Sequence, residues 1–256
     1  HLGELGAPSA FDDGVIVGAG TLATNPVLAA AQEGGFMGGA VGEVHGAKLT
    51  GLFERAQVER PAAVLLLLDS GGVRLHEANA GLIAVSEVMR ALLKTRTQGI
   101  PVIALIGGAF GCFGGTGIVA RCCDAIIMSE EGRLGMSGPE VIETVMGVEE
   151  FDSRDRALVW RTTGGKHRYL LGEADKLVDD DISAFREAAI ELLAQPPSFS
   201  LKSIEREHAR LANRLDAFGA CHDATEIWEK LGVSAPESLA LMDAAEFAAT
   251  VADKRA

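Results

Sequence analysis

Clusters of glycine constrain the fold of this chain more than any other feature. The 256 residues include 31 glycines, whereas an average usage of about 7% predicts about 18. Four clusters, each close to a short apolar run, occupy Gly34–Gly46, Gly71–Gly72, Gly107–Gly117 and Gly132–Gly138. Glycine lets the backbone turn sharply and approach a ligand closely. We therefore expect tight turns at strand ends that bring main-chain atoms to a bound molecule.

Between the clusters, strand and helix patterns alternate. Ala63–Leu68 is a β-like apolar run, Gly71 and Gly72 turn the chain, and Glu77–Lys94 carries apolar residues at helical spacing. The other predicted strands are Gly14–Leu22, Pro26–Gln32, Pro101–Ile106 and Asp124–Met128, and the other predicted helices are Ala47–Arg60 and Gly114–Arg121. Alternation with short connections predicts an α/β fold.

The pattern becomes wholly helical after residue 181. Two amphipathic helices are predicted on either side of Pro196 and Pro197. Their apolar positions are Ile182, Phe185, Ala189 and Leu192 in the first, and Ile204, Leu211, Leu215 and Phe218 in the second. We therefore divide the chain into a domain at residues 1–195 and a helical C-terminal extension at 196–256 that packs on the domain or on a partner.

Charge and hydropathy exclude several classes of protein. The net charge of −13 disfavours nucleic acid or an anionic membrane as a partner. The longest apolar run, Ala62–Leu68, is far shorter than the ~20 residues of a transmembrane helix, and no signal peptide opens the chain. We expect a soluble, cytoplasmic protein. Because the first residue is His1 rather than Met, we also expect residues to precede it.

The cysteines predict a reduced compartment and no metal site. Cys112, Cys122, Cys123 and Cys221 do not form two pairs at metal-ligand spacing, and His222 beside Cys221 has no matching partner motif.

A stretch of basic residues has two interpretations. It could meet an acidic protein or ligand phosphates, or it could be a solvated loop and helix face. Its members are Arg154, Arg156, Arg161, Lys166, His167 and Arg168.

Two glycine turns form the candidate reactive site. Asp69–Arg74 and Gly111–Gly117 each follow a predicted strand and precede a predicted helix. At such a place free N–H groups and the positive end of the helix dipole face outward together and attract an oxyanion. A structural role in close packing is the alternative.

In this order, the motifs resemble the crotonase superfamily and, within it, the carboxyltransferase branch that handles acyl-thioester enolates. Gly34–Lys48 resembles the GGS-x-G-x-VHG-x-K segment of that branch, Ser70–Glu77 its SGGAR-x-QE turn and Leu134–Glu143 its GPEVIE segment. Glu149–Gly165 is similar to the beta subunits of biotin-independent malonate decarboxylases. The resemblance covers roughly Asp13–Asp181.

The resemblance implies a crotonase-like (ClpP/crotonase) spiral of ββα units for residues 1–195. It implies a carboxy-lyase that converts a malonyl thioester on an acyl carrier protein subunit to the acetyl thioester. The carrier protein supplies a coenzyme A-like prosthetic group of the phosphoribosyl-dephospho-CoA type, and no metal or biotin is expected. The implied partners are a homologous gamma subunit with a second oxyanion hole, the acyl carrier protein and its transferase subunit.

The resemblance also assigns roles to residues of the two turns. Gly114 and Gly115 match the glycines whose amides face the thioester oxygen, where removing one donor typically costs ~10²–10³ in rate. The turn along the thioester and pantetheine arm is matched by Gly71, Gly72, Val73 and Arg74.

The proton donor is less defined. The Glu of hydratases in this superfamily is matched by Ile118 and is therefore missing. The second catalytic carboxylate of the hydratases aligns with Glu140. This residue could protonate the enolate if burial raises its pKa, or it could have a structural role as a cap or in a pair beside Pro139.

His45 and His76 lie beside glycine turns and could be ligand contacts or hydrogen-bonded structural histidines. Arg74 could bind a phosphate or carboxylate, or pair with Glu77.

Three rival functions remain open. A carboxyltransferase subunit of a biotin-dependent acyl-CoA carboxylase or decarboxylase shares the fold and the enolate, and the run Asp152–Gly165 favours the decarboxylase. A serine hydrolase would use Ser70, but no convincing His and Asp partners are present. A scaffold would bind the carrier protein or a catalytic partner without taking part in the chemistry.

Overall fold

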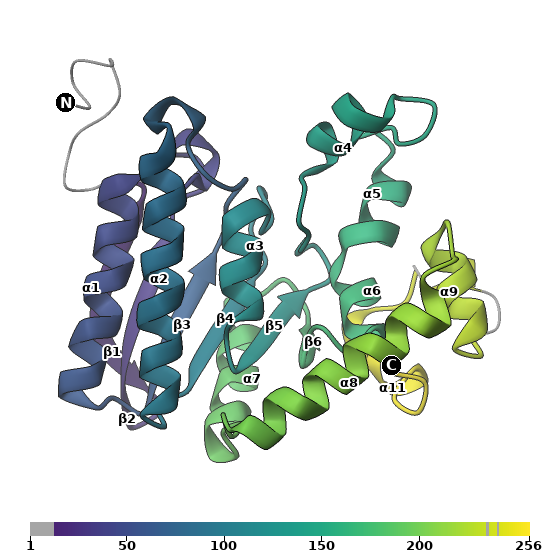
Figure 1. Ribbon diagram of the computed structural model, residues 1–256. Coiled ribbons are helices and arrows are strands. Elements are labelled where there is room, and N and C mark those ends of the chain that lie inside the picture. Colours follow the sequence, from purple (N-terminus) through teal and green to yellow (C-terminus); the bar gives the residue numbers. More distant parts are fainter. Residues whose placement is uncertain (1–12, 234–235, 240) are drawn as a thin grey trace.

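A six-stranded sheet lies at the centre of the computed structural model, which describes residues 13–233, 236–239 and 241–256 (Figure 1). β1 pairs antiparallel with β2, and every later pair is parallel, in chain order. Residues 1–12, which belong to the first predicted domain, lie outside the described part. The strands are β1 (Val15–Leu22), β2 (Asn25–Gln32), β3 (Ala63–Leu68), β4 (Val102–Ile106), β5 (Ala125–Ser129) and β6 (Lys176–Val178).

Helices cover both faces of this sheet. α1 (Glu43–Glu59), α2 (Asn79–Thr97) and α3 (Gly114–Arg121) lie together on one face (Figure 1), and the core beneath them includes the fully buried Phe53, Leu66 and Leu92. α7 (Ile182–Ala194) packs on the other face through Ala188 and Ala189. Burial on both faces explains why β3 is apolar without alternation.

A short second ladder of bridges lies beyond the strand ends. Val41 pairs with Val73, Ser70 with Cys112, and Cys112 with Leu134, all in parallel. Val41, Val73 and Cys112 each lie between a strand of the main sheet and the next α-helix. The repeat is therefore long strand, short strand and helix, as expected for the ββα units of a crotonase-like fold.

The C-terminal helices build a third core. Leu170 of α6 (Gly165–Leu170) and Leu177 of β6 pack with Trp228 and Phe247. The remaining helices here are α8 (Leu201–Phe218), α9 (Ala224–Lys230), α10 (Pro236–Leu239) and α11 (Ala244–Thr250). The domain boundary at residue 195 stays a prediction.

The predicted helices on either side of the proline pair are present, but not all their apolar positions are buried. Leu215 of α8 is 71% exposed and Ile182 of α7 is 86% exposed. Ile182 is exposed because it opens α7, and the part of the helix that packs on the sheet begins about one turn later.

Gly46 accounts for the largest error in a helix boundary. The prediction began the first helix at Ala47, whereas α1 begins at Glu43. Gly46 lies inside the helix, where a Cβ atom would be 2.4 Å from the Cβ of Ala84. Here the glycine serves close packing of α1 on α2 rather than a turn. The sequence analysis did not define β6, α6, α4 (Pro139–Met146) or α5 (Arg156–Thr163), which are short elements.

Candidate active site

The two glycine turns predicted from the sequence lie against each other. Ser70 N–H donates to the carbonyl of Gly111 at 2.6 Å, and Phe113 N–H donates to the carbonyl of Ser70 at 2.9 Å. A Cβ atom on Gly114 would be 3.3 Å from the Cα of Gly72. Gly72 and Gly114 have φ angles of 132° and 57°, which favour glycine. The contact between the turns therefore depends on both glycines.

Three amides in these turns have no acceptor in the part of the chain that the structure describes. They belong to Val73, at the end of the first turn, and to Gly115 and Thr116, in the first turn of α3. The first N–H groups of a helix have no partner within it. Val73 and Gly115 are neighbours, because a Cβ atom on Gly115 would lie 3.3 Å from Cγ1 of Val73. Such a pair of donors suits a developing oxyanion.

The other amides predicted for the site are already bonded. Gly114 N–H donates to the carbonyl of Met136 at 3.0 Å, and Gly71 N–H donates to the carbonyl of Gly38 at 2.8 Å. Gly72 N–H donates to Ser70 Oγ at 3.2 Å. These bonds hold the turns in shape. The prediction that the Gly114 amide faces the thioester oxygen is corrected accordingly, and Gly115 keeps that predicted role.

Arg74 is buried within an ion-pair network. It is 2% exposed, and its guanidinium contacts Asp13 at 2.6 Å and Glu77 at 3.0 Å. Its Nε also donates to the carbonyl of Ala40 at 2.9 Å. Of the two interpretations, the pair with Glu77 is the one that the structure has. The side chain of Arg74 is therefore not available to a ligand phosphate, and only its main chain can line a thioester arm.

Glu140 lies in the first turn of α4 and is exposed. A Cβ atom on Gly138 would be 3.7 Å from Glu140 Oε2 and 3.9 Å from the ring of Phe113, so the carboxylate lies near the residue that precedes α3. The described residues do not supply the burial that a proton donor would need. Its role in proton transfer stays a prediction.

The histidines beside the turns differ in environment. His45 is fully buried, its Nε2 lies 3.1 Å from Nε2 of Gln32, and burial lowers its pKa to about 4. It is neutral at physiological pH, as expected of a structural histidine. The side chain of His76 is 40% exposed and lies 4.0 Å from Glu77.

Ser70 is fully buried and lacks the base that a hydrolase needs. Its Oγ lies 2.9 Å from Oγ1 of Thr116, and no histidine among the described residues bonds to it. Thr116, which the sequence analysis did not single out, thus ties the first turn to α3.

Cys112 and Cys123 are also buried, and burial raises the pKa of both thiols, which makes them unreactive.

Three glycines make room for Asp69, another residue without a role in the sequence analysis. Cβ atoms on Gly34, Gly39 and Gly108 would lie 2.1 Å, 1.8 Å and 2.1 Å from Asp69 atoms. Asp69 Oδ1 accepts a hydrogen bond from the amide of Phe110 at 2.7 Å, and burial raises the pKa of its carboxyl group. The first and third glycine clusters therefore meet at the residue that begins the first turn.

The basic stretch at 154–168 is largely neutralised within the chain. Four of its six members form ion pairs with carboxylates, and His167 is buried against Trp228, whose Nε1 donates to His167 Nδ1 at 3.0 Å. The stretch is therefore mainly a set of internal ion pairs. The pairs are Arg156 with Glu131 at 2.5 Å, Arg161 with Asp223 at 3.0 Å, Lys166 with Glu130 at 3.1 Å, and Arg168 with Glu173 at 3.1 Å.

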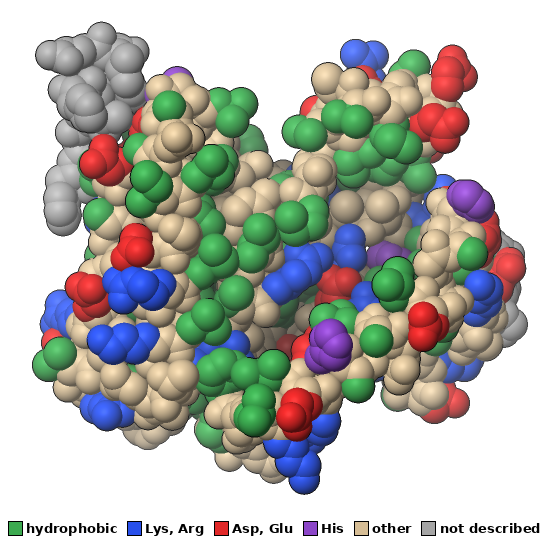
Figure 2. All heavy atoms as spheres, viewed as in Figure 1, with side chains coloured by type: hydrophobic (Ala, Val, Ile, Leu, Met, Phe, Trp, Pro, Cys, Tyr) green, Lys and Arg blue, Asp and Glu red, His purple; other side chains and the backbone are tan. Residues whose placement is uncertain are grey.

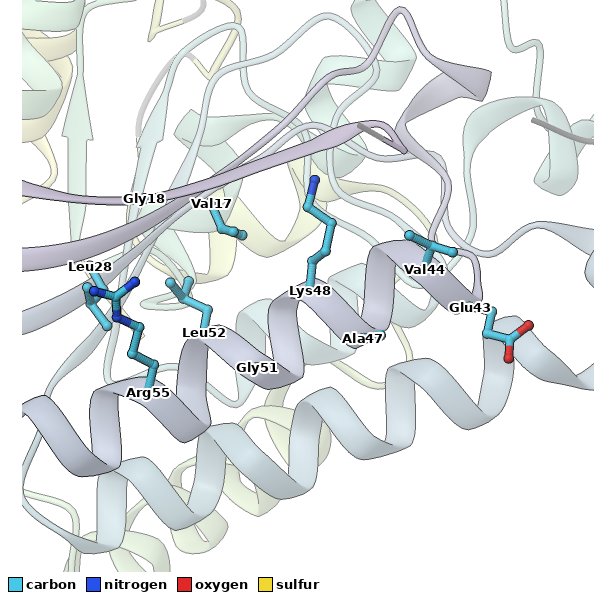
Figure 3. A pocket seen from close by; sticks show the side chains of 10 residues that line it. All are labelled: Val17, Gly18, Leu28, Glu43, Val44, Ala47, Lys48, Gly51, Leu52 and Arg55. Carbon is cyan, nitrogen blue, oxygen red and sulfur yellow. The ribbon is translucent and has the colours of Figure 1, made fainter. Parts of the chain in front are cut away.

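Two grooves of about 540 Å³ lie on the molecule. One runs between β1 and α1 and is lined by Leu28, Lys48, Leu52 and other residues (Figure 3); neither glycine turn contributes to it. The other lies between the sheet and α7 and includes Asp69, so it reaches the start of the first turn.

Among the described residues, no three His, Cys, Asp or Glu side chains are grouped to hold a metal ion. None of the described helices is both long and apolar enough to cross a membrane.

Comparison with known proteins confirms the predicted fold and resemblance. The carboxyl transferase domain family matches residues 3–210. Malonyl-S-ACP:biotin-protein carboxyltransferase MADC of Malonomonas rubra is 42% identical over 97% of this chain and 84% of its own length. The structure of a Pseudomonas malonate decarboxylase hetero-tetramer with malonate matches with a TM-score of 0.81 and 38% identity over 90% of this chain and 84% of that chain. The Pseudomonas MdcD–MdcE hetero-dimer matches with a TM-score of 0.67 and 37% identity over 80% of this chain and 88% of that chain.

Proposed function

The chain belongs to the carboxyl transferase domain family, and from this we propose that it is a subunit of a malonate decarboxylase. The reaction is loss of carbon dioxide from a malonyl thioester held on an acyl carrier protein subunit. The similarity to a malonyl-S-ACP carboxyltransferase and to a malonate decarboxylase supports a malonyl thioester as the substrate.

The observation that carries this proposal is the pair of unbonded amides of Val73 and Gly115 in adjoining turns. When the bond between the α-carbon and the carboxylate breaks, its electron pair passes into the thioester and leaves an enolate oxygen. Amide donors fixed beside that oxygen bind the enolate more strongly than the neutral thioester, which lowers the barrier. A proton delivered to the α-carbon then gives the acetyl thioester.

The turn from Gly71 to Arg74 is the proposed path of the thioester and pantetheine arm. Its contribution comes from the main chain, since the Arg74 side chain is engaged with Asp13 and Glu77. The arm belongs to the coenzyme A-like prosthetic group of the carrier protein, of the phosphoribosyl-dephospho-CoA type. We propose that neither a metal nor biotin takes part.

An exposed apolar surface beside Glu140 supports a partner subunit at this site. Val141, Val145, Met146 and Val148 are each 55–76% exposed, and Figure 2 shows hydrophobic side chains gathered over α4. Such a surface is typical of an interaction site. The proposed occupant is a homologous gamma subunit, which would complete the site and bury Glu140. The carrier protein and its transferase are the other proposed subunits.

The test is release of carbon dioxide from malonate by the complex assembled from purified subunits. We expect release that is insensitive to avidin and to EDTA. The Malonomonas relative is named as a malonyl-S-ACP:biotin-protein carboxyltransferase. Release that requires a biotinyl protein and stops with avidin would therefore indicate that the chain transfers the carboxyl group to biotin, and would contradict the proposed direct decarboxylation. Unchanged release of carbon dioxide after loss of the Gly115 donor would favour the alternative in which this chain is a scaffold that takes no part in the chemistry.

A further inference from the structure

Arg133 is a cation beside the candidate site that has no ion-pair partner among the described residues. Its Nη2 donates to the carbonyl of Ala109, and its buried Nε has no hydrogen-bond partner. No carboxylate oxygen of the described chain lies within 4.0 Å of its guanidinium. The residue as a whole is only partly buried, but burying part of a charge without a direct counter-charge costs free energy. The guanidinium therefore lacks a carboxylate in direct contact.

Aromatic rings fix the guanidinium in this position. Its Cζ lies 5.8 Å from the centre of the Phe113 ring and 4.7 Å from that of Trp160. Cation–π contacts of this kind hold a guanidinium without neutralising it. Arg156 lies 4.1 Å from the same Trp160 ring, but it is paired with Glu131. Two arginines thus contact one tryptophan, and only Arg133 lacks a carboxylate.

The position of Arg133 links it to the two turns. Its carbonyl accepts the amide of Cys112 at 2.7 Å, and a Cβ atom on Gly111 would lie 3.2 Å from its Cβ. Phe113, whose ring it faces, directly precedes α3 and the Gly115 amide. Glu140 and Asp69 are the acidic groups with the largest electrostatic effect on it, and both lie near the ends of the turns. The unpaired charge is therefore at the edge of the proposed thioester site.

We propose that Arg133 binds the carboxylate of the malonyl group and so selects acidic acyl thioesters over neutral ones. This inference rests on the proposed function. Arg133 makes and breaks no covalent bond. The carboxylate loses its charge as its electron pair passes to the thioester and carbon dioxide departs, so Arg133 binds the substrate more strongly than the transition state. Loss of Arg133 should therefore weaken substrate binding and raise KM without lowering kcat.

The experiment compares two thioesters of pantetheine as competitive inhibitors of the assembled complex. One is acetyl pantetheine, and the other is sulfoacetyl pantetheine, in which a sulfonate that cannot leave as carbon dioxide replaces the carboxylate. We expect Arg133→Gln to weaken the sulfoacetyl inhibitor and to raise the KM for the malonyl substrate by about 10-fold or more. Inhibition by acetyl pantetheine should change by less than about 2-fold, and kcat should not fall. Arg156→Gln is the matched control, because Arg156 contacts the same ring but is already paired, and it should leave the ratio of the two inhibition constants unchanged.

Other outcomes overturn the inference. Equal weakening of both inhibitors, or loss of subunit assembly on size-exclusion chromatography, would mean that Arg133 has a structural role or pairs with a partner subunit. No change in either inhibitor would also refute it. If Arg133→Gln does not fold, Arg133→Lys keeps the charge and loses the fork, and it should still weaken only the sulfoacetyl inhibitor. A wild-type complex that binds both thioesters but releases no carbon dioxide would contradict the proposed function, while the ratio of inhibition constants would still test Arg133.

Discussion

Gly72 and Gly114 meet across the two turns, with a Cβ atom on Gly114 only 3.3 Å from the Cα of Gly72. The two residues are 42 positions apart in the sequence and have no side chains to separate them. Their contact makes neighbours of Val73 and Gly115, whose amides are unbonded in the described chain. The proposed chemistry depends on this arrangement of main-chain donors, and the first two predictions concern it.

Gly115→Pro removes the proposed donor. We expect decarboxylation by the assembled complex to fall by ~10²-fold or more, equivalent to roughly 3 kcal/mol of transition-state stabilisation, with a smaller change in thioester binding. Gly115→Ala is the control, because it keeps the N–H and adds a Cβ atom 3.0 Å from Val85, so it reports the effect of crowding alone. Circular dichroism and partner binding check the fold. A folded proline variant with near wild-type turnover would place the donor elsewhere.

Gly114→Ala should destabilise the chain and separate the turns. The φ angle of Gly114 is 57°, which costs an L residue about 1 kcal/mol or more, and the new methyl group would press on Gly72. Denaturant unfolding measures the loss. Gly51→Ala in α1 is the control, since a Cβ atom there meets nothing within 4 Å and should stabilise the helix by about 0.5–1 kcal/mol. Equal stability of the two variants would contradict the prediction.

The isolated chain should decarboxylate a malonyl thioester poorly. Glu140 is exposed, and the apolar surface of α4 lacks a cover in the described chain. Under the proposed function, a gamma subunit covers this surface and contributes half of the site. Turnover measured with and without that subunit tests this dependence. Full activity of the purified chain on its own is the contrary result.

Glu173 should make stability depend on pH in the acid range. Burial alone would raise its pKa, but Arg168, Arg121 and Arg214 outweigh burial and lower the pKa from 4.5 to about 2. A lowered pKa in the folded state adds stability that is complete above the unfolded value and is lost as pH falls from about 5 towards 2.

Glu173→Gln tests this network at two pH values. We expect a loss of about 3 kcal/mol in the free energy of unfolding at pH 7, because buried guanidinium groups lose their partner, and a much smaller difference near pH 2. Urea unfolding provides the measurement. Glu131→Gln breaks the exposed pair with Arg156 and should change stability by less than about 1 kcal/mol. A Glu173→Gln loss that stays constant from pH 7 to pH 2 would exclude the proposed ionic origin.

The sequence by itself determined strands β1 to β5, the helices α1, α2, α3, α7 and α8, and the position of the turns. Ala63–Leu68 and Gly114–Arg121 were predicted with the bounds that β3 and α3 have. Such elements follow from local patterns, because apolar periodicity and the conformational freedom of glycine act over a few residues. The order of the motifs also carried the resemblance that the comparisons confirm.

Only the tertiary structure decided which groups of those turns are free. The Gly114 amide is bonded to Met136, and the Arg74 guanidinium to Asp13, 61 positions away in the chain. Arg133 has no such partner and was not singled out in the sequence, where nothing distinguishes it from the paired Arg156. A hydrogen bond or ion pair depends on which distant segments packing brings within about 3 Å, and local sequence patterns carry no information on that distance.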